Sequence, residues 1–198
     1  LDQHPSIVKS AYDELGFFDD NFKLGWAWYR SLFPTSMKKK RIKNKTGRFL
    51  TFDDTPFYIY NETVAKRIKQ FFPDGKIIVL LRNPIDRAYS NYFLGVQMGD
   101  EKRSFDEVVL EEIDHIKQYD EIQIDEYLSQ SYLGRGLYAA QLEIWFKHFQ
   151  RENILIIKSE DFSIKTSEIM EQVFEFLNLS KYKIKNVQKS NVAEYPDM

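Results

Sequence analysis

The sequence predicts an α/β fold, in which helices cover both faces of a parallel sheet. Two apolar runs, KIIVLL at 76–81 and NILIIKSED at 153–161, are typical of strands that are buried on both faces. Helical patterns of about a dozen residues lie between and beside these runs, and strands that alternate with such helices form parallel βαβ units. A third strand is expected at 49–52, FLTF.

Helices are predicted where apolar residues repeat every three or four positions. The segment 62–72 has this pattern and ends at Pro-Asp-Gly, which stops a helix. Asn83 and Pro84 are typical of an N-cap and a first helical residue. The helix that begins there has an apolar stripe made of Ile85, Ala88, Tyr89, Tyr92, Phe93 and Val96. Ser90 lies off this stripe.

Three more helices are indicated further along the chain. Ser104 and Glu107 have the spacing of a capping box, which marks a helix start. The segment 137–149, LYAAQLEIWFKHF, places large apolar residues on one helical face. After the second strand, an apolar stripe that ends at Leu177 predicts a last helix.

The composition indicates one globular domain, 1–198, and excludes several classes of protein. A chain of 198 residues that is 43% hydrophobic can bury a core. A formal net charge of −2 gives no overall attraction to nucleic acid. The absence of cysteine excludes disulfides and thiolate sites, and it suits the cytoplasm. The three histidines lack ligand spacing, so no metal site is predicted, and no apolar run is long enough to span a membrane.

Arg82 directly follows the first apolar strand, at the carboxyl end where open α/β sheets bind their ligands. Its guanidinium could hold a phosphate through two parallel hydrogen bonds, or it could form an ordinary ion pair with Asp86. Ser90 lies about two turns into the next helix. It could share the same anion, or it could be an exposed helix serine.

Glu14 stands just before an aromatic pair, Phe17 and Phe18. A carboxylate packed against these rings would lose solvation, and that loss would make it a stronger base. The alternative is a surface acid, because three aspartates lie close by in the sequence.

Two other segments give weaker indications of anion binding. The run KKKRIKNK at 38–45 is interpreted as a loop, and charge runs of this kind are usually solvated, so no ligand is assigned to it. GRG at 134–136 opens a helix, where free N–H groups could receive an anion, although helix entry alone explains the glycines. A Walker A motif is absent.

The stretch PDGKIIVLLRNPIDRAYSNY, 73–92, resembles the 3′-phosphate-binding segment of sulfotransferases that use 3′-phosphoadenosine 5′-phosphosulfate (PAPS). It is similar to the branch that contains heparan sulfate sulfotransferases and bacterial relatives. HPSI, DELGFFDDNFKLGWAWYRSLFP, DDTPFYIYNETVAKRI, SYLGRGLYAAQLEIWFKHF and ILIIKSEDF also occur in the family's order at similar spacing. The resemblance covers nearly the whole chain and implies the three-layer fold of P-loop nucleoside triphosphate hydrolases.

The resemblance also implies roles for individual residues. Arg82 and Ser90 would bind the 3′-phosphate of PAPS, and Arg135 and Tyr138 would be cofactor neighbours. Glu14 would be the base that takes the proton of the acceptor. The acceptor cleft would be lined by Phe17, Phe18, Asp54, Thr55, Pro56 and Phe57. The implied reaction is in-line transfer of a sulfuryl group to a hydroxyl or amine, without a metal. Carbohydrate, lipid, carrier-bound acyl and small-metabolite acceptors are all left open.

The sequence departs from the family in two ways. Asp13 and Asp54 stand where many relatives have lysines, so we expect a neutral or differently charged acceptor rather than a polyanion. The family's 5′-phosphosulfate loop would precede Leu1, and a further segment would follow residue 198. We therefore expect the central portion of a longer domain. A non-catalytic nucleotide-binding or scaffold remnant and a nucleotide kinase of the same broad fold are the alternatives.

Overall fold

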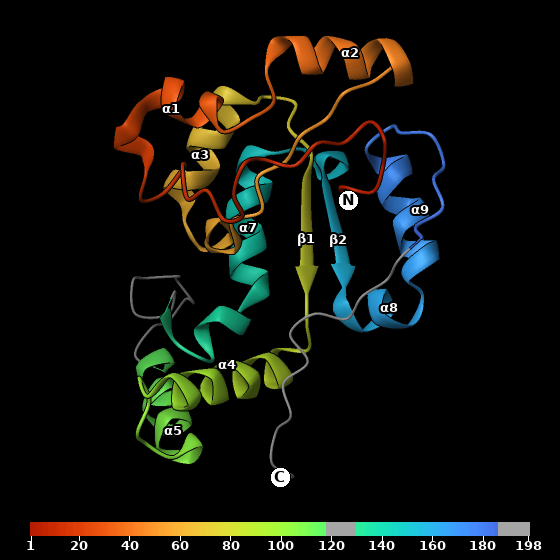
Figure 1. The fold of residues 1–198 in the computed structure, drawn as a ribbon. Coiled ribbons are helices and arrows are strands. Elements are labelled where there is room, and N and C mark those ends of the chain that lie inside the picture. Colours follow the sequence, from red (N-terminus) through yellow and green to blue (C-terminus); the bar gives the residue numbers. More distant parts are fainter. Residues whose placement is uncertain (118–129, 186–198) are drawn as a thin grey trace.

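The structure is a computed structural model that describes residues 1–117 and 130–185 (Figure 1). Two strands, β1 (Ile77–Leu81) and β2 (Ile154–Lys158), form a parallel pair. Helices lie on both sides of this pair, so the predicted three-layer α/β fold with a parallel sheet is confirmed.

The helices and short 3₁₀ turns follow one another in this order along the described chain: η1 (Phe22–Leu24), α1 (Gly25–Ser31), α2 (Ser36–Thr46), η2 (Pro56–Tyr60), α3 (Glu62–Phe71), α4 (Pro84–Met98), α5 (Phe105–Ile116), η3 (Gly134–Gly136), α7 (Tyr138–His148), η4 (Arg151–Asn153), α8 (Ser159–Ile164) and α9 (Thr166–Phe176). The predicted helices correspond to α3, α4, α5, α7 and α9. The predicted N-cap at Asn83 and the capping box of Ser104 and Glu107 are both confirmed. None of the described helices is long and apolar enough to cross a lipid bilayer.

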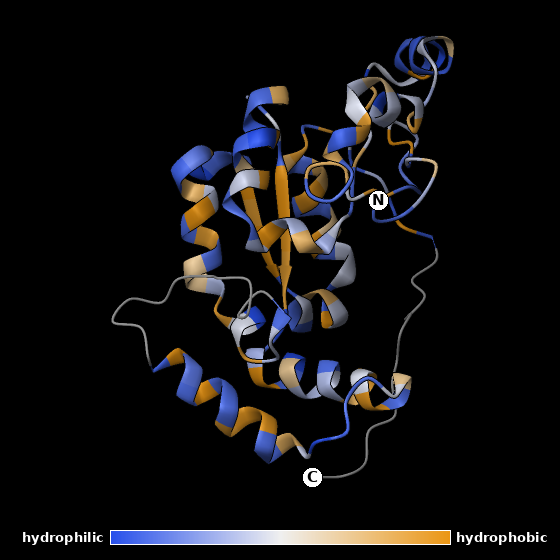
Figure 2. Ribbon diagram, turned by 90° about the vertical axis from the view of Figure 1, so that its left-hand side faces the viewer, coloured by the Kyte–Doolittle hydropathy of each residue, from blue (hydrophilic) through white to orange (hydrophobic). Residues whose placement is uncertain are grey.

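Alternate side chains of the two strands enter two different cores. Val79 and Ile154 face α3 and α7, where they join a cluster that contains Phe17, Phe18 and Trp145. A second cluster lies on the opposite face, where Ile157, Ile78 and Leu155 pack against α9. In Figure 2 both strands are strongly hydrophobic and lie between these helical layers. The arrangement fixes the direction of β1, whose carboxyl end points toward α4 (Figure 1).

Burial of β1 and α4 is less complete than the sequence predicts. Leu80 lies on the α9 face but is 55% exposed, because α8 and α9 pack mainly against β2. In α4, Ala88 and Tyr92 are buried, whereas Ile85 at the start of the predicted stripe is 70% exposed. Val96, at its other end, is also exposed.

Three predictions about local structure are wrong. Residues 49–52 form no strand. Within this segment, Leu50 makes only an isolated bridge with Ile7. The run at 38–45 is part of α2 rather than a loop. The last three residues of 153–161 begin α8, since β2 ends at Lys158.

Candidate functional site

The candidate site begins where β1 runs into α4. Asn83 lies between them, and its Oδ1 accepts hydrogen bonds from the first-turn amides of Ile85, at 2.9 Å, and Asp86. Its own N–H donates to Oε1 of Glu160 at 2.7 Å. Glu160 belongs to the first turn of α8, directly after β2. The segments that follow the two strands are therefore joined, and Arg82 lies directly between the end of β1 and this bond in the sequence.

Arg82 is exposed at this strand end. No ion pair joins it to Asp86 or to another carboxylate within the described ranges, and Glu160 supplies only a weaker charge interaction. The alternative of an ordinary ion pair with Asp86 is therefore wrong. Ser90 lies two turns along α4 and is half-buried. An exposed guanidinium without a carboxylate partner at a strand end is suited to an anionic ligand.

The segment that carries Arg135 packs directly against the first turns of α4. A methyl group on Gly136 would lie 3.0 Å from Cβ of Pro84, so the two backbones are in close contact. Arg135 Nη1 donates to Oδ1 of Asn91, beside Ser90, at 3.4 Å. From α4, Arg87 donates to the carbonyl of Tyr132. These contacts bring the predicted cofactor neighbour Arg135 to the same helix as Ser90.

Aromatic rings from η2 complete one side of this cluster. The guanidinium of Arg135 lies 4.9 Å from the ring centre of Phe57 and 6.0 Å from that of Tyr60. Burial raises the pKa of the Tyr138 phenol, while the nearby charge of Arg87 opposes that shift. Burial also lowers the pKa of Arg87, although the guanidinium remains charged because arginine starts from a very high value. The structure thus joins Phe57, Arg135 and Tyr138 in one cationic and aromatic cluster.

The backbone of the GRG segment does not offer the free amides that an anion would need. The N–H groups of Arg135, Gly136 and Leu137 donate to carbonyl groups, and that of Gly134 donates to Ser131 Oγ at 2.8 Å. These amides give no support to a backbone anion site at 134–136, and the entry into α7 explains the glycines, as the sequence indicates. The segment's contribution to the site comes from the Arg135 side chain.

A second group of predicted residues lies around Glu14. The backbone N–H of Glu14 donates to Oδ1 of Asp54 at 3.2 Å, and that of Gly16 donates to Thr55 Oγ1 at 3.0 Å. Asp53 organises this turn, because its carboxylate accepts from Thr55 and from the hydroxyl of Tyr58 at 2.9 Å. Since Tyr58 and Phe57 share η2, this group is connected to the cationic cluster.

The aromatic pair next to Glu14 has a different role from the one expected. Phe17 and Phe18 are 1% and 2% exposed and lie in the core, where Phe17 stacks on Tyr29 at 4.4 Å between ring centres. Glu14 is exposed, so the desolvation expected from these rings is not found. Asp54, Pro56 and Phe57 are exposed, whereas Thr55 is half-buried. An acceptor could therefore reach Asp54, Pro56 and Phe57, but not the buried Phe17 and Phe18.

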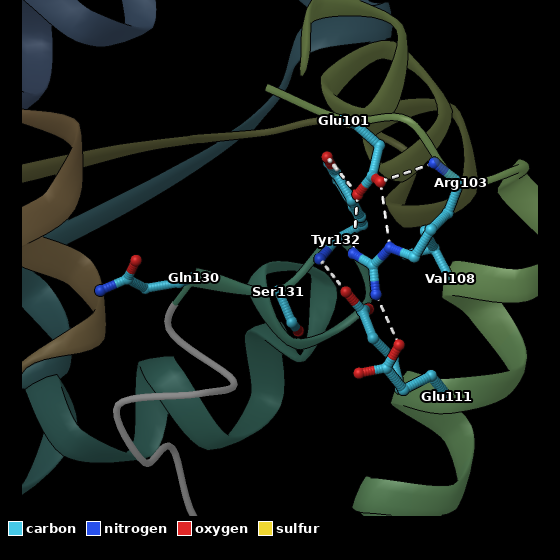
Figure 3. A pocket seen from close by; sticks show the side chains of 8 residues that line it. Glu101, Arg103, Val108, Glu111, Gln130, Ser131 and Tyr132 are labelled. Carbon is cyan, nitrogen blue, oxygen red and sulfur yellow. Dashed lines mark hydrogen bonds and ion pairs between the residues drawn. The ribbon is translucent and has the colours of Figure 1, made fainter. Parts of the chain in front are cut away.

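A recess of about 630 Å³ lies between α5 and the segment 130–132 (Figure 3). Its wall contains Glu101, Glu111 and Glu112, so it does not suit an anion. Glu112 is buried and accepts hydrogen bonds from the backbone N–H groups of Tyr132, at 2.7 Å, and Leu133. Glu112 therefore fixes the segment that leads to Arg135. We assign the ligand site to the region around Arg82 and the first turns of α4 instead of this recess.

The chain is similar to known proteins of one family. The family model described as "Sulfotransferase domain" matches residues 4–195. This chain belongs to the sulfotransferase domain family. Among curated relatives, it is 29% identical over 178 residues to heparan sulfate glucosamine 3-O-sulfotransferase 3B1 of Mus musculus. This alignment covers 90% of the chain and 41% of that protein.

Two further sulfotransferase relatives extend the comparison. The chain is 28% identical to bifunctional heparan sulfate N-deacetylase/N-sulfotransferase 4 of Mus musculus, over 90% of the chain and 20% of the relative. The crystal structure of a sulfotransferase from Alicyclobacillus acidocaldarius superposes with a TM-score of 0.65 at 27% identity, and covers 98% of this chain and 78% of that one. The chain therefore spans 41% of the length of the first curated relative and 20% of the length of the second.

Sequence reasoning about this sulfotransferase domain missed Arg87 and Asn91. Arg87 is half-buried, and its Nε is buried without a hydrogen-bond partner among the described residues. A one-turn spacing along α4, Asn83, Arg87 and Asn91, is the signal that could have placed both on the side that meets η3. The apolar stripe of α4 is the stronger signal in the sequence, and neither residue belongs to it.

Proposed function

We propose that the protein containing this sulfotransferase domain transfers a sulfuryl group from PAPS to a hydroxyl or amine of an acceptor. The observation that carries the proposal is Arg82, which is exposed and without a carboxylate partner within the described ranges, at the carboxyl end of β1. Arg82 and Ser90 would hold the 3′-phosphate, and Arg135 and Tyr138 would bind nearby parts of the nucleotide. Charge-assisted hydrogen bonds from arginine give such a site both affinity and orientation.

In this proposal, Glu14 takes the acceptor proton as the acceptor oxygen or nitrogen attacks sulfur. The S–O bond to the phosphate of PAPS breaks as the new bond forms, and 3′,5′-ADP leaves. One feature of the backbone supports Glu14: its φ of +50° is an uncommon conformation for a residue with a Cβ. Backbone conformations of this kind concentrate at functional sites.

The experiment that tests the nucleotide site is a calorimetric titration of the chain with 3′,5′-ADP and with 5′-AMP, which lacks the 3′-phosphate. We expect micromolar binding of 3′,5′-ADP, which Arg82→Ala weakens by about 100-fold, the size of two lost charge-assisted hydrogen bonds. Binding of 5′-AMP should change little in the same variant. Arg30→Ala removes another exposed arginine, from α1, and serves as the control. Equal losses for both nucleotides would contradict a 3′-phosphate role for Arg82.

The role of Glu14 is tested by turnover in the complete protein. Glu14→Gln should lower kcat by at least about 100-fold while the Kd of 3′,5′-ADP is unchanged, because general base catalysis contributes on that scale. The neighbouring exposed acid provides the control, Asp13→Asn, which should retain activity. Binding of 3′,5′-ADP without turnover of any acceptor would favour the alternative, a nucleotide-binding scaffold.

We further propose that the acceptor carries no dense negative charge. Asp54 is exposed close to Glu14 and would repel a polyanion, whereas Asp13, also exposed, forms an ion pair with Lys9 and adds less to this repulsion. A screen of acceptors should therefore favour neutral or cationic compounds, and Asp54→Lys should improve binding of a sulfated glycan. Tight binding of such a glycan near Glu14 by the unaltered protein would contradict this part of the proposal.

A further inference from the structure

Helix α2 carries an unusual concentration of positive charge. Its sequence, SMKKKRIKNKT, holds six Lys or Arg among eleven residues and no acid. The whole chain has 28 basic and 30 acidic residues, so the part outside α2 has 22 basic and 30 acidic residues and a formal net charge of −8. The molecule is therefore electrically divided between a cationic helix and an acidic remainder.

These charges are exposed and not compensated by the described part of the protein. All six basic residues of α2 are exposed, and none of them forms an ion pair with a described carboxylate. Lys39 lies 5.9 Å from the ring centre of Phe49, which is a weak contact at a solvated site. The charge of α2 is therefore available to a partner.

The helix is formed in spite of this charge. Lysines in its first turn oppose the helix dipole, and like charges three and four residues apart repel one another. Its ends compensate: Thr35 caps the first turn, and Gly47 ends the helix in the left-handed conformation. After the helix, Arg48 Nη1 donates to the carbonyl of Asn178 at 2.8 Å and so attaches it to the chain beyond α9. A dense anionic partner would relieve the repulsion within α2.

The position of α2 leaves it free to make such contact. In both Figure 1 and Figure 2, α2 lies at the outer edge of the molecule, at the end opposite α4. Its residue Met37 is 82% exposed and presents an apolar side chain beside the charges. A partner bound to α2 would not cover the strand end that carries Arg82.

We propose that α2 docks the protein on a lipid membrane that contains anionic headgroups. Five of the six cations are lysines, which act as hydrated point charges rather than as bidentate forks for one defined anion. Recognition therefore depends on charge density, which an anionic bilayer supplies, and each Lys or Arg close to such a surface adds to the attraction. Met37 can enter the headgroup region. The acidic remainder is repelled by the same surface, so contact is confined to the α2 end.

The docking is tested by sedimentation of the full 198-residue chain with vesicles of phosphatidylcholine alone or with 30% phosphatidylglycerol. Binding should require the anionic lipid and weaken as salt screens the charges. The variant K40E/R41E/K43E should bind at least about 100-fold more weakly, because each basic residue contributes roughly fivefold. The matched control, K102E/K165E/K181E, reverses three exposed lysines elsewhere and should bind nearly as well as the unaltered chain.

Folding of the variants is checked separately by circular dichroism and thermal unfolding, since Lys and Glu have similar helix propensities. Equal losses in both triple variants would overturn the proposal, because they would reflect net charge alone. Absence of binding to anionic vesicles would overturn it as well. If a soluble sulfated polysaccharide binds through α2 while vesicles do not, the surface recognises a polyanion and the membrane assignment is wrong. All these outcomes are independent of 3′,5′-ADP binding.

Discussion

The backbone N–H of Asn83 donates a 2.7 Å hydrogen bond to the carboxylate of Glu160, and this bond joins the segments that follow the two parallel strands. It also lowers the pKa of Glu160, so the carboxylate is ionised at neutral pH. Glu160 therefore has two opposite effects on an anion at Arg82. It holds the backbone beside Arg82 in place, but its negative charge repels the ligand.

Two substitutions of Glu160 separate these effects. Glu160→Gln keeps an oxygen that can accept from Asn83 and removes the charge, so the affinity for 3′,5′-ADP should rise by about two- to fivefold, the size of one surface charge interaction. Glu160→Ala removes the acceptor as well and should gain less or lose affinity. The measurement is titration calorimetry at low and high salt. A gain for Gln that persists at 1 M salt would contradict an electrostatic origin.

Gly136 and Pro84 test the contact between the Arg135 segment and α4. Gly136→Ala places a methyl group 3.0 Å from Cβ of Pro84, whose ring cannot rotate away. The free energy of unfolding should fall by about 1–3 kcal/mol, as in other overpacked sites, and urea unfolding measures it. Because the segment must move, affinity for 3′,5′-ADP should fall too. Gly136→Ser, which is larger, should cost more; an equal or smaller cost would show that this contact yields easily.

The sequence predicts the helices whose signals are local. Asn83 and Ser104 cap α4 and α5 as expected, because a cap depends on a side chain and the next three amides. The same local reasoning missed α2, in which Met37 and Ile42 are too few to form an apolar stripe. Its start and end depend on Thr35 and Gly47 instead, and these two single-residue signals are weak beside a run of charged residues.

Contacts between distant segments are harder to predict from one sequence. Leu50 could form a strand only with a suitable partner, and it meets Ile7 at a single bridge. Arg82 could be placed because the carboxyl end of a parallel strand has a fixed position in the fold. The environment of Glu14 could not be predicted in this way. The turn at 14–16 directs the aromatic pair into the core and leaves the carboxylate of Glu14 exposed to solvent.

Asp53 should matter more for stability than its neighbour Asp54. Its carboxylate accepts from Thr55 N and Oγ1 and from the hydroxyls of Tyr58 and Tyr29, at distances from 2.7 to 3.2 Å. Asp53→Ala leaves these donors without a partner and should lower the free energy of unfolding by about 2–4 kcal/mol. Asp54 is exposed, so Asp54→Ala should change it by less than about 0.5 kcal/mol. Urea unfolding of both variants makes the comparison, and similar costs would contradict the central role of Asp53.

The ionisation of Glu101 makes the stability of the fold depend on pH. Arg103 donates to both of its carboxylate oxygens, Nε at 3.0 Å and Nη2 at 2.7 Å (Figure 3), and these bonds lower the pKa of Glu101 from 4.5 to about 2. Since the pKa is lower in the folded state than in the unfolded state, the ionised carboxylate stabilises the fold at pH values above 4.5. That stabilisation is lost as the pH falls from 4.5 toward 2.

The variant Glu101→Gln should therefore be less stable than the unaltered chain at pH 6, and the difference should shrink steadily between pH 4.5 and pH 2. Urea unfolding at a series of pH values measures this difference. Glu111 also bonds to Arg103, at 2.5 Å, but its side chain is 55% exposed, so Glu111→Gln is the control and should show a smaller dependence. A difference for Glu101→Gln that stays constant from pH 6 to pH 2 would mean that lost packing, and not the charge of Glu101, sets its effect.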